Sequence, residues 1–298
     1  MVNTPLLTIS FQLSASFMTL ALFSSVQATS AQTSSVQTSN AQTSSAQSQA
    51  AGLEARVQLE ELILDLERGG IPKGTAEVSV YFPPRKEPIQ SADKLPRLGL
   101  IGKLIRQNFE LSTVTAEKFL GREVNKLELK PKLESASSWN FWIDAQWSTP
   151  LAFEQRDFEG KLIRRAAYTA LLEQKVPKRR SQPKPILVRP SLEKRLEVAL
   201  KGFAPPQGFR AVSIKRSKRG ELQTLEMTFS DGLNTFPLIL TTKGTKAAEG
   251  IAVRKLGPVW LWMVGRFPKS TLEGTLASVK GSVDVEGLGT FVDSGNSN

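Results

Sequence analysis

The sequence contains no cysteine and no histidine among its 298 residues. Without cysteine there can be no disulfide, no thiolate nucleophile and no cysteine-bound zinc. Without histidine the commonest general base and metal ligand is missing as well. No Gly-x-Ser-x-Gly elbow is present, and acidic residues such as Asp157 and Asp231 fall in turn sequences. We therefore predict a protein that is not an enzyme, with no catalytic residue, no metal and no cofactor.

Charge is missing from the first 53 residues. Phe17–Phe23 is an apolar run, and Val26-Gln27-Ala28 has the small residues that a signal peptidase accepts, so residues 1–28 are predicted to be a signal peptide. The apolar stretch is too short to span a bilayer, which needs about 20 residues. Residues 29–52 repeat Ala, Gln, Thr and Ser and are predicted to be a low-complexity linker without regular structure. These features predict a periplasmic or otherwise exported protein with no transmembrane span.

The net charge of +11 is concentrated in one segment, residues 175–201, which has nine basic and two acidic residues. Four prolines occur there, so residues 175–200 are predicted to be an extended linker between domains at 53–174 and 201–280, followed by a disordered tail at 281–298. The basic side chains either keep the linker solvated or bind an acidic partner. The candidate partner-binding residues are Arg179, Arg180, Lys184, Arg189, Lys215 and Arg216. Aromatic residues are not interleaved with them, so nucleic-acid binding is not expected.

Apolar residues alternate with polar ones over much of residues 121–168, which predicts an antiparallel meander. Leu127 and Leu129 share one face, and Trp139, Phe141 and Ile143 share one on the next run. Such a sheet has an apolar face that needs a cover. Two amphipathic segments, at 53–68 and around 98–106, are predicted to be helices that provide it. Alternation over 75–82 predicts a further strand.

The ordered motifs of this region resemble those of the MucB/RseB family of periplasmic regulators, whose N-terminal domain is in turn similar to the lipoprotein carrier LolA. The matching motifs are Gly121-Arg122, Leu129–Pro131, Trp142-Ile143-Asp144, Pro150-Leu151 and Asp157–Gly160, and, in the second domain, Phe203–Arg210 and Ser230–Leu233. The resemblance implies an α+β fold: a half-open antiparallel β-barrel or sheet covered by helices, with a smaller mixed C-terminal domain.

The apolar face has two interpretations. Its residues form either an ordinary core or, as the resemblance to LolA implies, a cavity that admits an acyl chain. The candidate lining residues are Val78, Val80, Leu127, Leu129, Phe141, Ile143 and Phe153.

The resemblance also implies a function. The chain would bind the extracytoplasmic domain of a membrane anti-sigma factor and shield it from proteolysis until a lipid-like ligand, produced under envelope stress, releases it. The alternative is a LolA-like periplasmic carrier or sensor of lipid or lipoprotein. A second domain favours the regulator, because a minimal carrier does not need one.

Overall fold

The structure is a computed structural model that describes residues 40–172, 176–177, 190–219, 222–244, 246–281 and 283. The predicted signal peptide, most of the basic linker and nearly all of the C-terminal tail lie outside these residues. The chain divides into two compact units, residues 1–47 and 48–298. Of the first unit the structure describes the beginning of helix α1, and both β-sheets belong to the second unit.

The elements of the first sheet and its helices precede those of the second sheet in the chain. They are α1 (Asn40–Arg68), β1 (Gly74–Val80), β2 (Ile89–Ala92), α2 (Gly102–Asn108), β3 (Phe109–Phe119), β4 (Arg122–Pro131), β5 (Ser138–Asp144), β6 (Thr149–Arg156) and β7 (Leu162–Leu171). The second set is α3 (Pro190–Ala199), β8 (Arg210–Arg219), β9 (Leu222–Ser230), β10 (Thr235–Thr241), β11 (Ile251–Leu256), β12 (Val259–Val264) and α4 (Lys269–Ala277).

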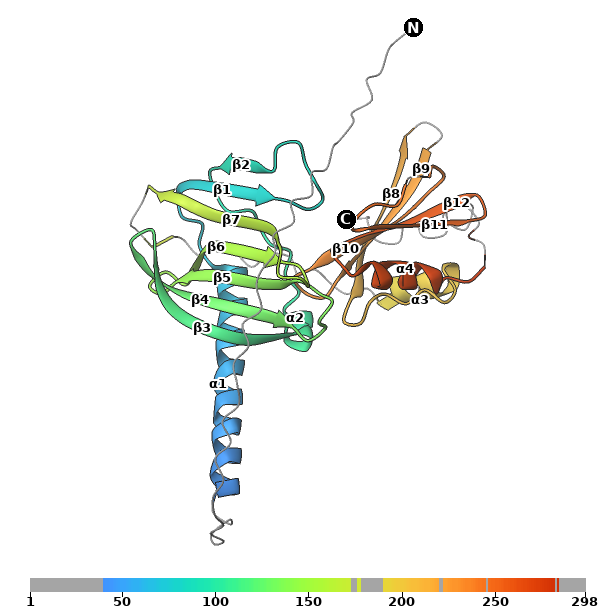
Figure 1. Cartoon of the computed structure of the whole chain (residues 1–298). Helices are drawn as coiled ribbons and strands as arrows, with labels where there is room; N and C mark the ends of the chain where they lie inside the picture. The colour runs from blue at the N-terminus through green and yellow to red at the C-terminus, as the bar shows by residue number, and fades with distance from the viewer. Residues whose placement is uncertain are drawn as a thin grey trace, which may run out of the picture. The chain divides into compact units, whose positions relative to one another are not determined.

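The first sheet has seven antiparallel strands in the order β2-β1-β7-β6-β5-β4-β3 (Figure 1). The meander predicted over residues 121–168 is confirmed as β4 to β7, which pair in sequence order, and β3 extends it at the edge. In register, Leu127 lies opposite Phe141, and Phe141 lies opposite Phe153, so these side chains share one face. The edge strands β2 and β3 do not pair with each other, and the sheet stays open rather than closing into a barrel.

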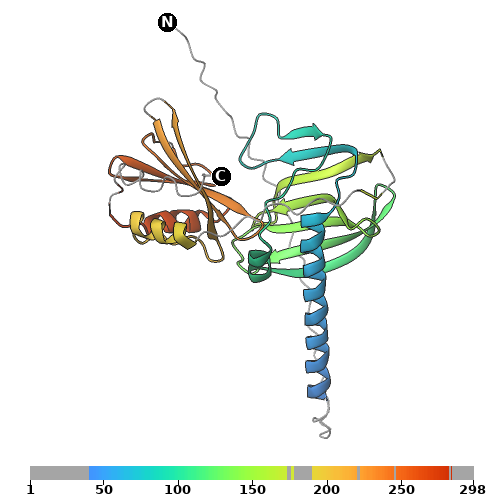
Figure 2. The ribbon, with the colours of Figure 1, turned by 180° about the vertical axis from the view of Figure 1, so that it is seen from behind.

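Helices and a loop cover the apolar face of this sheet. Leu62 and Ile63 of α1 and Ile105 of α2 belong to the same buried cluster as the strand residues. Figure 2 shows the C-terminal end of α1 in front of the strands. Leu95, in the loop before α2, is also buried in the cluster. This arrangement confirms the predicted fold class of a half-open sheet with a helical cover.

Both covering helices have boundaries that differ from the prediction. α1 begins at Asn40, inside the segment predicted as an unstructured linker, because the alanines and glutamines there are good helix formers. α2 begins only at Gly102, so residues 98–101 are not helical. Pro96 lacks an amide hydrogen and disfavours helical geometry in the preceding residue, and Gly99 adds a further entropic cost.

The second sheet has five strands in the order β11-β12-β10-β9-β8, with α3 and α4 side by side on one face (Figure 1). Leu196 and Leu200 from the α3 region and Leu272 and Leu276 of α4 pack against the sheet in a second buried cluster. The apolar strand β12 lies between β11 and β10, which explains why it lacks a polar face. The expected mixed α+β architecture of this part is confirmed.

Among the described residues, no helix combines the length and the apolar character that crossing a membrane requires.

Candidate functional site

The predicted cavity-lining residues lie on the apolar face of the first sheet. Leu127, Leu129, Phe141, Ile143 and Phe153 are buried in one cluster, whereas Val78 and Val80 are half-buried. The ring of Phe141 stacks on that of Trp139 with 5.8 Å between ring centroids. In this conformation the five buried side chains pack against one another and against α1. Their role as an acyl-chain site stays a prediction.

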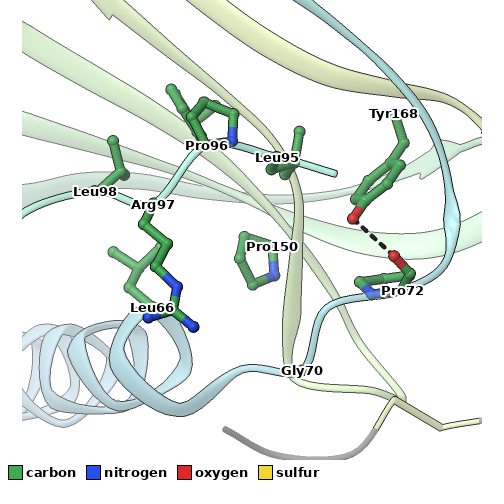
Figure 3. A pocket seen from close by; sticks show the side chains of 10 residues that line it. Leu66, Gly70, Pro72, Leu95, Pro96, Arg97, Leu98, Pro150 and Tyr168 are labelled. Carbon is green, nitrogen blue, oxygen red and sulfur yellow. Dashed lines mark hydrogen bonds between the residues drawn. The ribbon is translucent and has the colours of Figure 1, made fainter. Parts of the chain in front are cut away.

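An apolar pocket adjoins this cluster where the end of α1 meets the start of β1 (Figure 3). It is lined by Leu66, Gly70, Pro72, Leu95, Pro96, Arg97, Leu98, Pro150, Phe153 and Tyr168. Its volume of about 30 Å³ has room for one or two water molecules. A guest as large as an acyl chain would need the loop at residues 93–101 to move outward.

Of the seven predicted lining residues, Phe153 reaches this pocket. The loop residues Leu95 and Leu98 were not predicted as lining residues; Leu98 was assigned to a covering helix, and Leu95 precedes that helix. Pro96 was the available signal, since a proline at that position argues for an extended loop whose apolar side chains fold inward. Arg97 is exposed at the pocket and places a cation beside an otherwise apolar lining.

Tyr168 fixes one wall of the pocket, because its buried hydroxyl donates a hydrogen bond of 2.9 Å to the carbonyl oxygen of Pro72 (Figure 3). We expect Tyr168→Phe to lower the free energy of unfolding by about 1 kcal/mol, since a buried carbonyl loses its donor. Urea denaturation measures the change. Tyr81→Phe is the matched control, because Tyr81 is 42% exposed, and it should leave stability unchanged. Equal effects of the two variants would contradict this role of Tyr168.

The predicted basic residues fall into two groups. Arg179, Arg180, Lys184 and Arg189 lie outside the described residues. Lys215 and Arg216 are exposed on β8, an edge strand of the second sheet. Another cation of β8, Arg210, is held by Glu193 of α3 at 2.6 Å. The side-chain hydrogen bond from Arg210 lowers the pKa of Glu193. Because this pair joins β8 to α3, Arg210 is already engaged within the chain.

A buried hydrogen-bond network joins the two sheets at Asn234, in the turn between β9 and β10. The Oδ1 atom of Asn234 accepts from Trp139 Nε1 at 2.8 Å and from Gln155 Nε2 at 3.0 Å. Its Nδ2 donates to the Ser137 carbonyl oxygen at 3.0 Å and to Asp231 Oδ2 at 2.8 Å. Because the oxygen and the nitrogen of the Asn234 amide both have hydrogen-bond partners, the network holds this turn in one position on the first sheet.

Packing contacts and hydrogen bonds close to Asn234 strengthen this junction. Leu233 of the same turn packs into the apolar cluster of the first sheet, and Ala136 packs into that of the second. Asn108 donates to the carbonyl oxygens of Gly208 and Asp231, at 2.9 and 2.8 Å. The sequence predicted the turn at Ser230–Leu233 from its Asp-Gly pair, but a turn sequence does not indicate which distant side chains it will contact.

Asp231 is a buried carboxylate within this turn, and burial raises its pKa to about 6. It accepts hydrogen bonds from the backbone amides of Leu233 and Asn234, at 3.0 and 2.7 Å, which offset part of the desolvation. No ion pair to Asp231 occurs within the part of the chain that the structure describes. Ionising Asp231 therefore costs more free energy in the folded state than in the unfolded chain.

We expect Asp231 to make the protein more stable as the pH falls from 7 to 5. The folded state binds a proton near pH 6, whereas the unfolded chain does so near 3.8, so stability from this group is lost as the pH rises through 6. The difference between these pKa values corresponds to roughly 3 kcal/mol in total, of which about 1.4 kcal/mol is gained between pH 7 and 5, because one pH unit of that range lies below the folded pKa. Urea denaturation across this pH range, compared with Asp231→Asn, isolates the contribution. A wild-type slope equal to that of the variant would contradict the assignment.

The fold is similar to crystal structures of MucB. The structure titled "Crystal structure of MucB in complex with MucA(peri)" matches with a TM-score of 0.50 at 16% sequence identity and covers 77% of this chain and 100% of that chain. The Pseudomonas aeruginosa MucA/MucB complex gives the same TM-score and identity over 78% and 100%. MucB alone matches with a TM-score of 0.50 at 13% identity, over 77% and 98%. The similarity is one of fold.

No protein-family model matches the chain, and no curated protein sequence matches it.

Proposed function

We propose that this chain is an exported, non-enzymatic regulator that binds the extracytoplasmic domain of a membrane anti-sigma factor. The observation that carries this proposal is the fold similarity to MucB, which extends over the whole of MucB and so includes both sheets. In two of those structures MucB is in complex with MucA. By occupying the ectodomain, the chain would shield it from proteolysis, and a lipid-like ligand of envelope stress would release it.

The arrangement of the two sheets suits a regulator of this kind. A ligand shifts a binding equilibrium only if it interacts differently with the two states of the protein. The hydrogen bonds at Asn234 hold the second sheet in a defined position against the first. A ligand that broke these bonds would therefore change any partner-binding surface that both sheets form. The exposed cations of β8 provide a surface for an acidic segment of the partner.

Affinity purification with the tagged, processed chain tests the proposal. The bait is exposed to detergent extracts of the native envelope, and mass spectrometry should identify a membrane-anchored anti-sigma factor. The purified ectodomain should then resist a site-specific protease longer in the presence of the chain than alone. Absence of complex formation with the anti-sigma factors of the same genome would refute the proposal.

Charge reversal separates specific from general electrostatic attraction. Lys215→Glu should slow association with the ectodomain, most strongly at low salt, because like charges then oppose the encounter. Lys118→Glu is the matched control, since Lys118 is also exposed but lies on β3 of the other sheet. Equal effects of the two variants would show that β8 does not form the contact.

The alternative function is a carrier or sensor of lipid, and the pocket in Figure 3 is the observation that favours it. Its apolar lining with Arg97 nearby has the amphiphilic character of a lipid site, and outward movement of the loop at residues 93–101 would give an acyl chain the room that the closed pocket lacks. Native mass spectrometry of the protein purified from envelopes should then detect an acyl-chain ligand. Leu98→Asp should remove the ligand, whereas Leu64→Asp, on an exposed position of α1, should retain it. A ligand-free wild-type protein would contradict the carrier function.

A further inference from the structure

Arg164 of β7 is a cation on the apolar face of the first sheet. It lies opposite Gln155 of β6 and Val80 of β1. Its guanidinium carbon is 5.0 Å from the centroid of the Trp139 ring and 5.7 Å from that of Phe153. Aromatic faces attract a guanidinium and hold its plane, but they do not neutralise its charge.

The guanidinium of Arg164 is incompletely satisfied. Its Nε atom is buried and has no hydrogen-bond partner among the described residues, and no carboxylate within them forms an ion pair with it. Burial lowers the pKa of Arg164 to about 10, which leaves the group charged at neutral pH. The residue as a whole is half-buried, and a partly desolvated charge without a counter-ion is still costly, so an unpaired arginine at this position calls for a ligand.

The side chain lines a groove of about 310 Å³ between the two sheets. That volume is at the lower end of the range for small-molecule sites. Three arginines, Arg85, Arg164 and Arg266, contribute to the groove, and no acidic residue is found among the described residues that line it. Amide and hydroxyl groups of Gln155 and Thr235 are also present as neutral hydrogen-bonding groups.

The uncompensated positive charges of the groove indicate how much negative charge a bound anion should carry. Arg266 is already compensated by Asp157, at 2.7 Å, and by Glu249. Arg85 is exposed, and no ion pair involving it occurs in the described part of the chain. Two positive charges therefore remain, those of Arg85 and Arg164. A phosphate monoester carries about 1.5 to 2 negative charges near pH 7, whereas a carboxylate carries one.

We propose that this groove is a binding site for a phosphate monoester, with Arg164 as the anchoring residue and Arg85 as the second cation. The planar guanidinium presents parallel N–H donors that match two phosphate oxygens. Trp139 and Phe153 hold that fork in place, so little side-chain freedom is lost on binding. The ester is either a small soluble molecule or the head group of a lipid, and both share this chemistry.

Isothermal titration of the purified full chain tests the site, with no anti-sigma partner present, so that its result is independent of the function proposed above. The probes are inorganic phosphate, glycerol 3-phosphate and dihexanoyl phosphatidic acid below its micelle concentration, each at matched ionic strength. Arg164→Met should weaken binding by at least roughly 10- to 150-fold, the range expected for loss of a single charge-assisted hydrogen bond, because the guanidinium is proposed to donate two. Arg165→Met is the matched control: Arg165 is the next residue of β7, pairs with Glu154 at 3.3 Å, and should retain full affinity.

If Arg164→Met does not fold, Arg85→Met tests the same site, because Arg85 is exposed and its replacement leaves the core intact. This variant should also bind more weakly than the wild type. Binding of glycerol 3-phosphate as tight as that of the phosphatidic acid identifies a soluble ester, and much tighter binding of the lipid identifies a head group; either result supports the site. No saturable binding of any probe, or wild-type affinity in both Arg85→Met and Arg164→Met, would overturn the proposal.

Discussion

Arg266→Met should lower the free energy of unfolding by about 3 kcal/mol, near the lower end of the 3–5 kcal/mol that breaking a buried ion pair costs. Arg266 lies just after β12 and donates to Asp157 Oδ2 from Nε at 3.1 Å and from Nη2 at 2.7 Å. The side chain of Asp157 has no solvent exposure. Removing Arg266 therefore leaves a carboxylate buried without its counter-charge.

Two features of the Asp157 turn place the loss at the lower end of that range. Asp157 Oδ1 accepts from the backbone amides of Glu159 and Lys161, at 3.1 and 2.9 Å, and both bonds remain in the variant. The side chain of methionine also preserves part of the contact that Arg266 makes with Phe82, whose ring centroid is 5.2 Å from the guanidinium carbon. The residual cost is the desolvation of one carboxylate oxygen.

Urea denaturation with matched variants separates this ion pair from its exposed neighbour. Glu249, the other partner of Arg266, has a side chain that is 77% exposed, so Glu249→Gln should change stability by less than about 1 kcal/mol. The double variant Arg266→Met, Asp157→Asn should be more stable than Arg266→Met alone, because it removes the unpaired charge. Equal losses for Glu249→Gln and Arg266→Met, or no recovery in the double variant, would contradict the burial argument.

The first sheet was predictable because its residues alternate over several consecutive strands. Leu127 and Leu129 on one strand and Trp139 and Phe141 on the next are local patterns, and a meander pairs neighbouring strands. The turn at Asp157–Gly160 followed from its Asp and Gly, and in the structure the amide of Gly160 donates to the carbonyl oxygen of Asp157.

The candidate sites were less predictable because they depend on contacts between distant segments. Arg164 follows Trp139 by 25 positions in the sequence, and only the register of β5, β6 and β7 brings their side chains together. The arginine-lined groove also needs residues of both sheets. A charged residue at an apolar-face position of a strand was the available signal for Arg164. Its missing partner is visible only in three dimensions.

Asn234→Asp should destabilise the protein strongly at pH 8 and much less at pH 5. The substitution replaces the Nδ2 donor with an oxygen that faces Asp231 Oδ2, which is now 2.8 Å from Nδ2. Two buried carboxyl groups at this separation cannot both ionise without strong repulsion, so one retains a proton to higher pH. The Ser137 carbonyl oxygen loses its donor as well. At pH 8 the combined loss should be about 3–5 kcal/mol, as for an uncompensated buried charge.

Protonation explains why the loss should shrink in acid. Burial already raises the pKa of Asp231 to about 6, and a second carboxyl group beside it raises the apparent pKa of the pair further. At pH 5 one carboxyl group of the pair is protonated and donates to the other, which restores a hydrogen bond in place of the lost one. The bonds from Trp139 and Gln155 to the remaining oxygen are retained.

Asn234→Ala provides the control, because it removes the same hydrogen bonds without adding a charge. Its loss should be about 2–4 kcal/mol, from several buried groups left without partners. Because the hydrogen bond from Asn234 lowers the pKa of Asp231, its loss raises that pKa, so the stability of Asn234→Ala should depend on pH more than that of the wild type and less than that of Asn234→Asp. The measurement is urea denaturation of the three proteins between pH 5 and 8, with the free energy of unfolding plotted against pH. If the curve for Asn234→Asp runs parallel to that for Asn234→Ala, the two carboxyl groups do not interact, and the network at Asn234 does not hold the β9–β10 turn against the first sheet as described.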